Sequence, residues 1–131
     1  MVGTLIHSTR RRTRELALAY RIATTRVRKP ADRQHLARYE RTVEQLVARL
    51  AKLAAESAAD APRATTEWLG VGTARQDCVV FQTMQQLEEK VAAEIAALKS
   101  HVSRDARPAL ECALCGSEAR QHWLRSRAAE A

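Results

Sequence analysis

The sequence contains few of the residues that interrupt helices or build β-sheets. It has four glycines, three prolines and five aromatic residues, and it has no asparagine. A β-sandwich or barrel of this length needs many more β-branched and aromatic residues and a turn every ten or so positions, so those folds are excluded. Alanine, the strongest helix former, is the commonest residue with 25 copies. The composition therefore predicts an all-α protein of one domain over residues 1–131.

Long apolar runs and a secretory signal are also missing. No stretch approaches the roughly 20 apolar residues that span a bilayer, and arginines follow the short apolar start at residues 1–6. The three cysteines, Cys78, Cys112 and Cys115, are too few for the disulfide framework of a small secreted domain. We therefore expect a cytoplasmic protein that does not cross a membrane.

Prolines and glycines divide the chain into four predicted helical segments. A proline inside a helix costs about 3 kcal/mol, so Pro30, Pro62 and Pro108 mark helix ends. The prediction is a basic N-terminal helix within 1–33, long helices at 31–59 and 73–102 separated by a loop at 60–72, and a short C-terminal helical tail within 104–131.

The two long segments each carry an apolar seam with heptad-like spacing. Steps of three and four residues place the seam on one helix face. Two amphipathic helices joined by a loop of about 13 residues pack most simply antiparallel, so we predict a hairpin over 31–103 in a small helical bundle. Pairing of the seams between copies of the chain, as a coiled coil, is the alternative. The seams are Leu36, Tyr39, Val43, Leu46, Leu50 and Leu53, and Val80, Met84, Leu87, Val91, Ile95, Leu98 and Val102.

The net charge of +7 is confined to the first 33 residues. Only Glu15 and Asp32 oppose nine basic side chains there, whereas basic and acidic groups balance in the rest of the chain. On a helix of 3.6 residues per turn, Arg10, Arg14 and Arg21 share one stripe with Arg28. The apolar arc beside this stripe, which includes Tyr20, is free to dock on the bundle. The nine basic residues are Arg10, Arg11, Arg12, Arg14, Arg21, Arg26, Arg28, Lys29 and Arg33.

A row of guanidinium groups suits phosphates, because each group can donate two parallel hydrogen bonds. Neutralised phosphates also release counterions, which supplies sequence-independent affinity. The sequence therefore predicts a nucleic-acid-binding protein that contacts the backbone of RNA or DNA through its N-terminal helix. The alternative is a coiled-coil adaptor or regulator whose basic helix docks on an acidic protein. Two further interpretations are that the basic helix lies on anionic lipid or that its basic face is simply solvated surface.

Recognition of individual bases is not expected. Asparagine, the usual reader of adenine, is missing, and the few aromatic residues are not interleaved with the arginines as a stacking platform requires. In size and charge the chain resembles the small all-helical subunits of CRISPR effector complexes, with which it shares no motif. This resemblance implies a role as a small subunit of a nucleoprotein complex, bound to further protein subunits.

The C-terminal tail contains Cys112-Ala-Leu-Cys115-Gly116, a spacing found in zinc knuckles. Two thiolates at this spacing can reach one metal ion, and a glycine after the second permits a tight turn. His122 is the expected third ligand, with His101 or Cys78 as the fourth. The alternative is that Cys112 and Cys115 are small packing residues on one helix face.

Signatures of catalysis are missing. The sequence has no glycine-rich phosphate loop, no Ser-His-Asp set and no Glu-x-x-His motif of a di-metal bundle. A redox C-x-x-C normally follows a strand, and no strand pattern precedes Cys112. We therefore expect a protein that is not an enzyme. Cys78 is expected in the core, and Trp68 and Trp123 either cover the bundle or anchor a partner.

The zinc prediction is tested by elemental analysis of protein purified without chelator. If the tail binds a metal, we expect about one zinc ion per chain, held by Cys112 and Cys115 with His122 as the third ligand. A zinc content far below one ion per chain would show that the two cysteines do not bind zinc.

Overall fold

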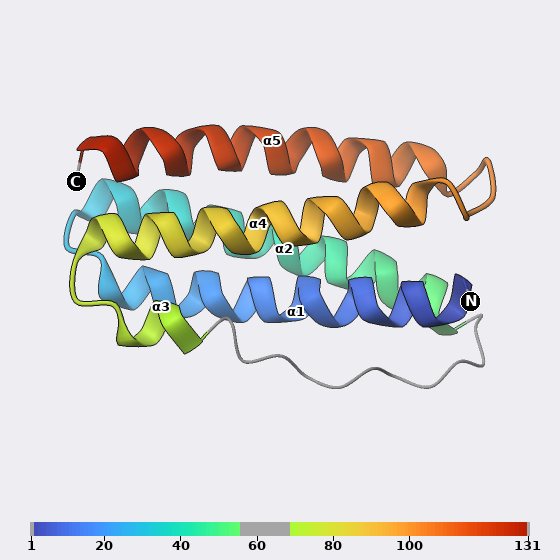
Figure 1. Ribbon diagram of the computed structural model, residues 1–131, viewed down its shortest axis with the longest axis horizontal. Coiled ribbons are helices and arrows are strands. Elements are labelled where there is room, and N and C mark those ends of the chain that lie inside the picture. The colour runs from blue at the N-terminus through green and yellow to red at the C-terminus, as the bar shows by residue number, and fades with distance from the viewer. Residues whose placement is uncertain (1, 56–68, 131) are drawn as a thin grey trace.

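The computed structural model describes residues 2–55 and 69–130 and is helical almost throughout these two ranges (Figure 1). The described residues include no β-strand, so the predicted all-α fold is confirmed. The helices are α1 (Val2–Arg26), α2 (Pro30–Ala55), α3 (Leu69–Thr73), α4 (Asp77–Lys99) and α5 (Arg107–Glu130).

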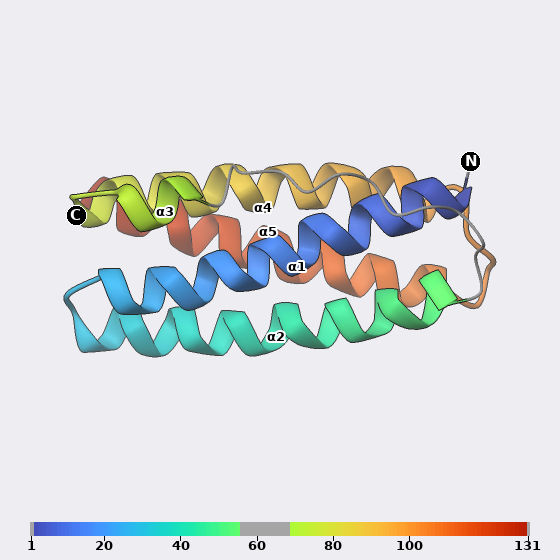
Figure 2. The ribbon, with the colours of Figure 1, turned by 90° about the horizontal axis from the view of Figure 1, so that it is seen from below.

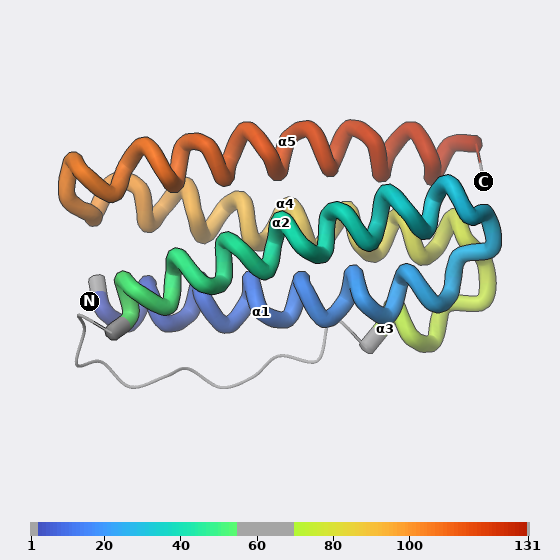
Figure 3. Tube along the Cα trace, turned by 180° about the vertical axis from the view of Figure 1, so that it is seen from behind, coloured from blue at the N-terminus to red at the C-terminus, as the bar shows by residue number. Residues whose placement is uncertain are grey.

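Four long helices form a bundle, in which α1 is antiparallel to α2 and α4 is antiparallel to α5 (Figures 1 and 2). α1 also packs against α4, and the short α3 covers these two helices at one end of the bundle. Seen from behind, α2 and α5 lie next to each other along the remaining side (Figure 3). Around the bundle the order is therefore α1, α2, α5, α4.

The predicted bundle of long antiparallel helices is confirmed, but its helices pair differently from the predicted hairpin over 31–103. α2 and α4 run in the same direction, and each packs instead against a terminal helix. An apolar seam specifies which face of a helix is buried and not which helix covers it. The connections at 27–29 and 100–106 are short, and short connections favour antiparallel neighbours. The C-terminal segment is accordingly a full-length bundle helix of 24 residues, not a short tail.

Helix ends follow the sequence signals in two of the three clearest cases. Pro30 is the first residue of α2, where its missing N–H removes no hydrogen bond, and Pro108 lies in the first turn of α5. Residues 69–72 were predicted as loop and belong instead to α3, because Val71 is fully buried against the bundle. Packing thus favours a helical turn despite the glycines on both sides of Val71.

The two predicted seams form the apolar core together with one face of α1. All seam residues are buried except Tyr39, Leu53 and Val102, which are partly buried against the same core. Leu16, Tyr20 and Ala23 of α1 and Val27, just after its end, are also buried, as the basic amphipathic pattern predicted. No helix within the two described ranges has an apolar stretch long enough to cross a bilayer.

A buried charge lies in the bundle interior, where α1, α4 and α5 meet. Glu88 is fully buried, and its Oε1 accepts hydrogen bonds from the Tyr20 hydroxyl (2.5 Å) and from Arg120 Nε (2.5 Å). Its Oε2 accepts from Ser117 Oγ (2.8 Å) and Arg120 Nη2 (3.3 Å). Both carboxylate oxygens are therefore satisfied, as a buried ion pair requires.

This cluster raises the pKa of two of its members. Burial, followed by the negative charge of Glu88, raises the pKa of Tyr20 well above its ordinary value. Burial alone would lower the pKa of Arg120, but the charge and hydrogen bonds of Glu88 outweigh it, so that pKa is raised. Tyr20 is therefore a neutral donor and Arg120 a permanent cation.

The position of the core is tested by replacing one seam residue. Leu50→Ala removes a side chain that is fully buried, and such a change costs about 2–5 kcal/mol of the free energy of unfolding. Ala96→Ser, at an exposed position of α4, is the control and should cost less than about 1 kcal/mol. Urea denaturation measures both, and equal midpoints would contradict the assigned core.

The Tyr20 environment predicts a loss of stability in alkali. The folded protein holds the phenol proton more tightly than the unfolded chain, so above about pH 10 the unfolded chain binds fewer protons and the free energy of unfolding falls as pH rises. Below pH 10 this contribution is fully present. Tyr20→Phe should be less stable at pH 8, because Glu88 loses a donor, yet depend less on pH between 10 and 11.5. Parallel curves for the variant and the wild type would contradict the assignment.

Candidate nucleic-acid interface

The nine basic residues of the N-terminal segment differ in what they contact. Arg12 pairs with Glu94 of α4 (2.8 Å), and Arg21 pairs with Glu40 and Glu44 of α2 (both 3.2 Å). The hydrogen bond to Glu40 and its charge raise the pKa of Arg21. These two arginines join α1 to its neighbours, and their charge is largely cancelled.

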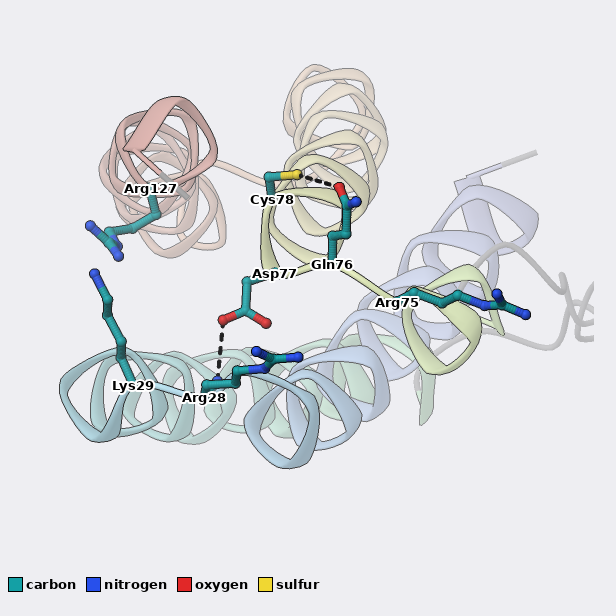
Figure 4. A pocket seen from close by; sticks show the side chains of 7 residues that line it. All are labelled: Arg28, Lys29, Arg75, Gln76, Asp77, Cys78 and Arg127. Atoms are coloured by element: carbon teal, nitrogen blue, oxygen red, sulfur yellow. Dashed lines mark hydrogen bonds between the residues drawn. The ribbon is translucent and has the colours of Figure 1, made fainter.

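The predicted arginine stripe is divided between two surfaces. Arg10, Arg14 and Arg21 line one groove between α1 and α2, so they share a face as predicted. Arg28 lies beyond Arg26, the last residue of α1, in the turn before α2. It belongs to a second surface at the end of the bundle (Figure 4). Arg11 is half-exposed on α1 and has no partner among the described residues.

The second surface, here called the basic end, surrounds an open pocket of about 310 Å³. Lys29 and Arg127 extend toward one another across its mouth, while Arg75 extends outward on the other side of Asp77 (Figure 4). The side chains of Arg28, Lys29 and Arg75 are exposed and have no partner in the described ranges. The basic end comprises Arg26, Arg28, Lys29, Arg33, Arg75 and Arg127.

Local hydrogen bonds hold this surface together. Asp77, the first residue of α4, accepts a hydrogen bond from the backbone N–H of Arg28 (3.2 Å), which fixes the α1–α2 turn beside the start of α4. Arg26 donates to the carbonyl of Ala74 (3.4 Å). Arg33 likewise donates to the carbonyl of Val27, at 2.8 Å. Because carbonyl oxygens carry no net charge, both arginines are oriented without being neutralised.

Acidic residues cancel only part of the charge of the basic end. Asp32 is buried and pairs with Arg127 (3.0 Å), which also contacts Glu130. With Asp77, three carboxylates oppose six basic side chains. The surface can therefore hold phosphate groups by charge-assisted hydrogen bonds.

Arg75 and Arg127 were not predicted as members of the site. They lie in the balanced part of the sequence, far along the chain from the basic segment, and no spacing connects them with it. Only the fold brings the α3–α4 turn and the end of α5 to the α1–α2 turn. Cys78 was expected in the core but is half-exposed and lines the same pocket, with its thiol 3.5 Å from the side-chain oxygen of Gln76.

The predicted zinc ligands lie on a continuous helix instead of a knuckle. Cys112, Cys115 and His122 are exposed on α5, and the helix passes through Gly116 without a turn. Within residues 2–55 and 69–130 no three metal-ligating side chains come together, and His101 is exposed in the turn after α4. The two cysteines are therefore not packing residues, and zinc stays a prediction that elemental analysis tests.

The glycine of the C-x-x-C-G sequence has a packing role. A Cβ at Gly116 would stand 3.3 Å from Nη1 of Arg120, so the missing side chain makes room for the arginine that pairs with Glu88. Trp123 covers the bundle, as one of its two readings predicted, and stacks on His35 of α2 with ring centroids 4.8 Å apart. Trp68 lies outside the described residues.

Comparison of the chain with protein-family models, with curated protein sequences and with solved structures finds no significant match. The similarity in size and charge to small CRISPR subunits thus gains no support from a relative. The function has to be argued from the geometry of the basic end and of α1.

Proposed function

We propose that the protein is a non-enzymatic nucleic-acid-binding protein of the cytoplasm. It contacts the phosphate backbone through the basic end and acts as a small helical subunit of a larger nucleoprotein complex. The observation that carries the proposal is the gathering of Arg28, Lys29 and Arg75 around one pocket, three exposed cations whose side chains have no partner among the described residues.

Contact with the phosphate backbone of a nucleic acid agrees with the chemistry of these side chains. One guanidinium group can donate parallel hydrogen bonds to two oxygens of a phosphate, whereas the lysine ammonium group acts as a point charge. Arg26 and Arg33 add two cations that carbonyl oxygens hold in place, which reduces the side-chain entropy lost on binding. The basic end thus offers a preorganised cationic surface.

Sequence-independent binding is part of the proposal. The aromatic rings near this end, including Phe81 and Trp123, pack against each other with centroids 5.6 Å apart. They are engaged inside the bundle, so they offer no platform on which a base could stack. Specificity would therefore come from backbone shape or from other subunits.

The proposal is tested by measuring affinity against salt concentration. The probes are a fluorescein-labelled 20-base-pair DNA duplex and a 20-nucleotide single-stranded RNA, and the readout is anisotropy between 20 and 300 mM KCl. Changing Arg28, Lys29 and Arg75 to Gln removes three charges from exposed positions, so folding should be unaffected. If all three contact phosphates, the salt slope should shrink by about 2.7 for the duplex and about 2.1 for the single strand.

The matched control changes Arg41, Arg49 and Lys52 to Gln, three exposed cations of α2 distant from the basic end. This variant should keep nearly the wild-type slope. Equal losses in both variants would show that only total charge matters. If the wild type binds neither probe at 20 mM KCl, the proposed function is wrong.

A further inference from the structure

The groove between α1 and α2 differs chemically from the basic end. It has an open volume of about 550 Å³ and a mostly apolar floor, to which Leu18 of α1 and Val47 of α2 contribute. Ala48 and Ala51 leave part of the α2 side low, so a partner's backbone can approach closely there. Glu44 lines the same side and is paired with Arg21. The α1 side is a row of arginines: Arg10, Arg14 and Arg21.

Two of these arginines are available to a partner. Arg14 is exposed and has no partner among the described residues, and Arg10 has a buried Nε without an acceptor. Both guanidinium groups can therefore donate hydrogen bonds to the carboxylates of a partner. Arg21 is already paired with Glu40 and Glu44.

The combination of an apolar floor and a basic edge identifies the kind of ligand. A phosphate backbone gains nothing from Leu18 or Val47, whereas an amphipathic helix buries its apolar face on such a floor. Acidic residues along one flank of that helix would meet the arginine row. A second copy of this chain does not fit, because Val79 is the one exposed large apolar side chain of the described residues.

We infer that the α1/α2 groove binds an acidic amphipathic helix of a protein partner. At 1.5 Å per residue, the arginine row from Arg10 to Arg21 extends about 16 Å, which matches three turns of a bound helix. The partner helix presents apolar residues at steps of three and four to the floor, and Glu or Asp at matching steps to Arg10 and Arg14. This goes beyond the proposed function, because the groove and the basic end are separate surfaces.

The test uses two synthetic 18-residue helical peptides with the same leucine and alanine face. One carries Glu along the flank that meets the arginine row, and the other carries Lys at the same positions. Fluorescence anisotropy at 50 mM KCl measures binding, and amide chemical shifts of the ¹⁵N-labelled protein locate it. The acidic peptide should bind and shift the amides of Leu18, Val47 and Ala51, and the lysine peptide should not bind.

Two variants and one control separate the groove from bulk charge. Changing Arg10 and Arg14 to Gln should weaken binding of the acidic peptide about tenfold, and Ala48→Glu, at an exposed floor position, should weaken it at least as much. Ala93→Glu on the exposed side of α4 adds the same charge elsewhere and should leave it unchanged.

The basic-end variant distinguishes failure of this inference from failure of the proposed function. Protein with Gln at positions 28, 29 and 75 should lose nucleic-acid affinity and keep peptide affinity. Binding of both peptides alike, shifts confined to the basic end, or no binding of the acidic peptide at 1 mM would each overturn the inference.

Discussion

The buried carboxylate of Glu88 constrains the arrangement of three of the four long helices. Its hydrogen-bond partners come from α1 and α5. The hydrogen bonds therefore form only when these two helices have one particular axial position relative to α4. A slide by one helical turn, about 5.4 Å, would leave a buried charge without donors. Removing one partner of a buried ion pair costs about 3–5 kcal/mol. The cluster therefore selects one register, a role for which polar residues in helical cores are well suited.

The register set by Glu88 also determines where the basic end forms. With α1 fixed against α4, the turn after α1 meets the first residue of α4, and Asp77 accepts the N–H of Arg28. α2 then reaches α5 at the same end, through the Asp32–Arg127 pair and the stacking of His35 on Trp123. Most of the surface cations are thus positioned by contacts that begin in the core, and Arg127 is held in addition by its ion pair with Asp32.

The sequence predicts the helices and most of the core, but not the charged cluster. Apolar periodicity identified the seams of α2 and α4 because burial of apolar area is the dominant favourable term. The same steps of three and four also pass through Glu88, from Met84 to Val91, and the carboxylate was not counted because it is charged. In α5 the core face runs through Ser117, Arg120 and Leu124. Polar residues in that face concealed a full bundle helix, which was therefore predicted as a short tail.

The candidate sites could be predicted only where their residues are close to one another in the sequence. Spacing on one helix placed Arg10, Arg14 and Arg21 on one face, whereas the neutralisation of Arg21 depends on Glu40 and Glu44, which only the packing of α1 on α2 brings near. Arg75 and Arg127 reach the basic end through the fold. A count of charged residues shows one positively charged segment at the N-terminus. Contacts between helices place the residues of that segment on two separate surfaces.

This division gives one basic segment two different surfaces. At the basic end mainly charged and polar side chains line the pocket, and a phosphate can replace the water that solvates the cations. Along the groove the cations border apolar floor, and there burial of a partner's side chains adds to the charge interaction. The two proposed ligands would occupy separate surfaces, because different residues line the basic end and the groove. Under the two proposals the protein would join a nucleic-acid strand to a neighbouring subunit, because one helical bundle carries both surfaces.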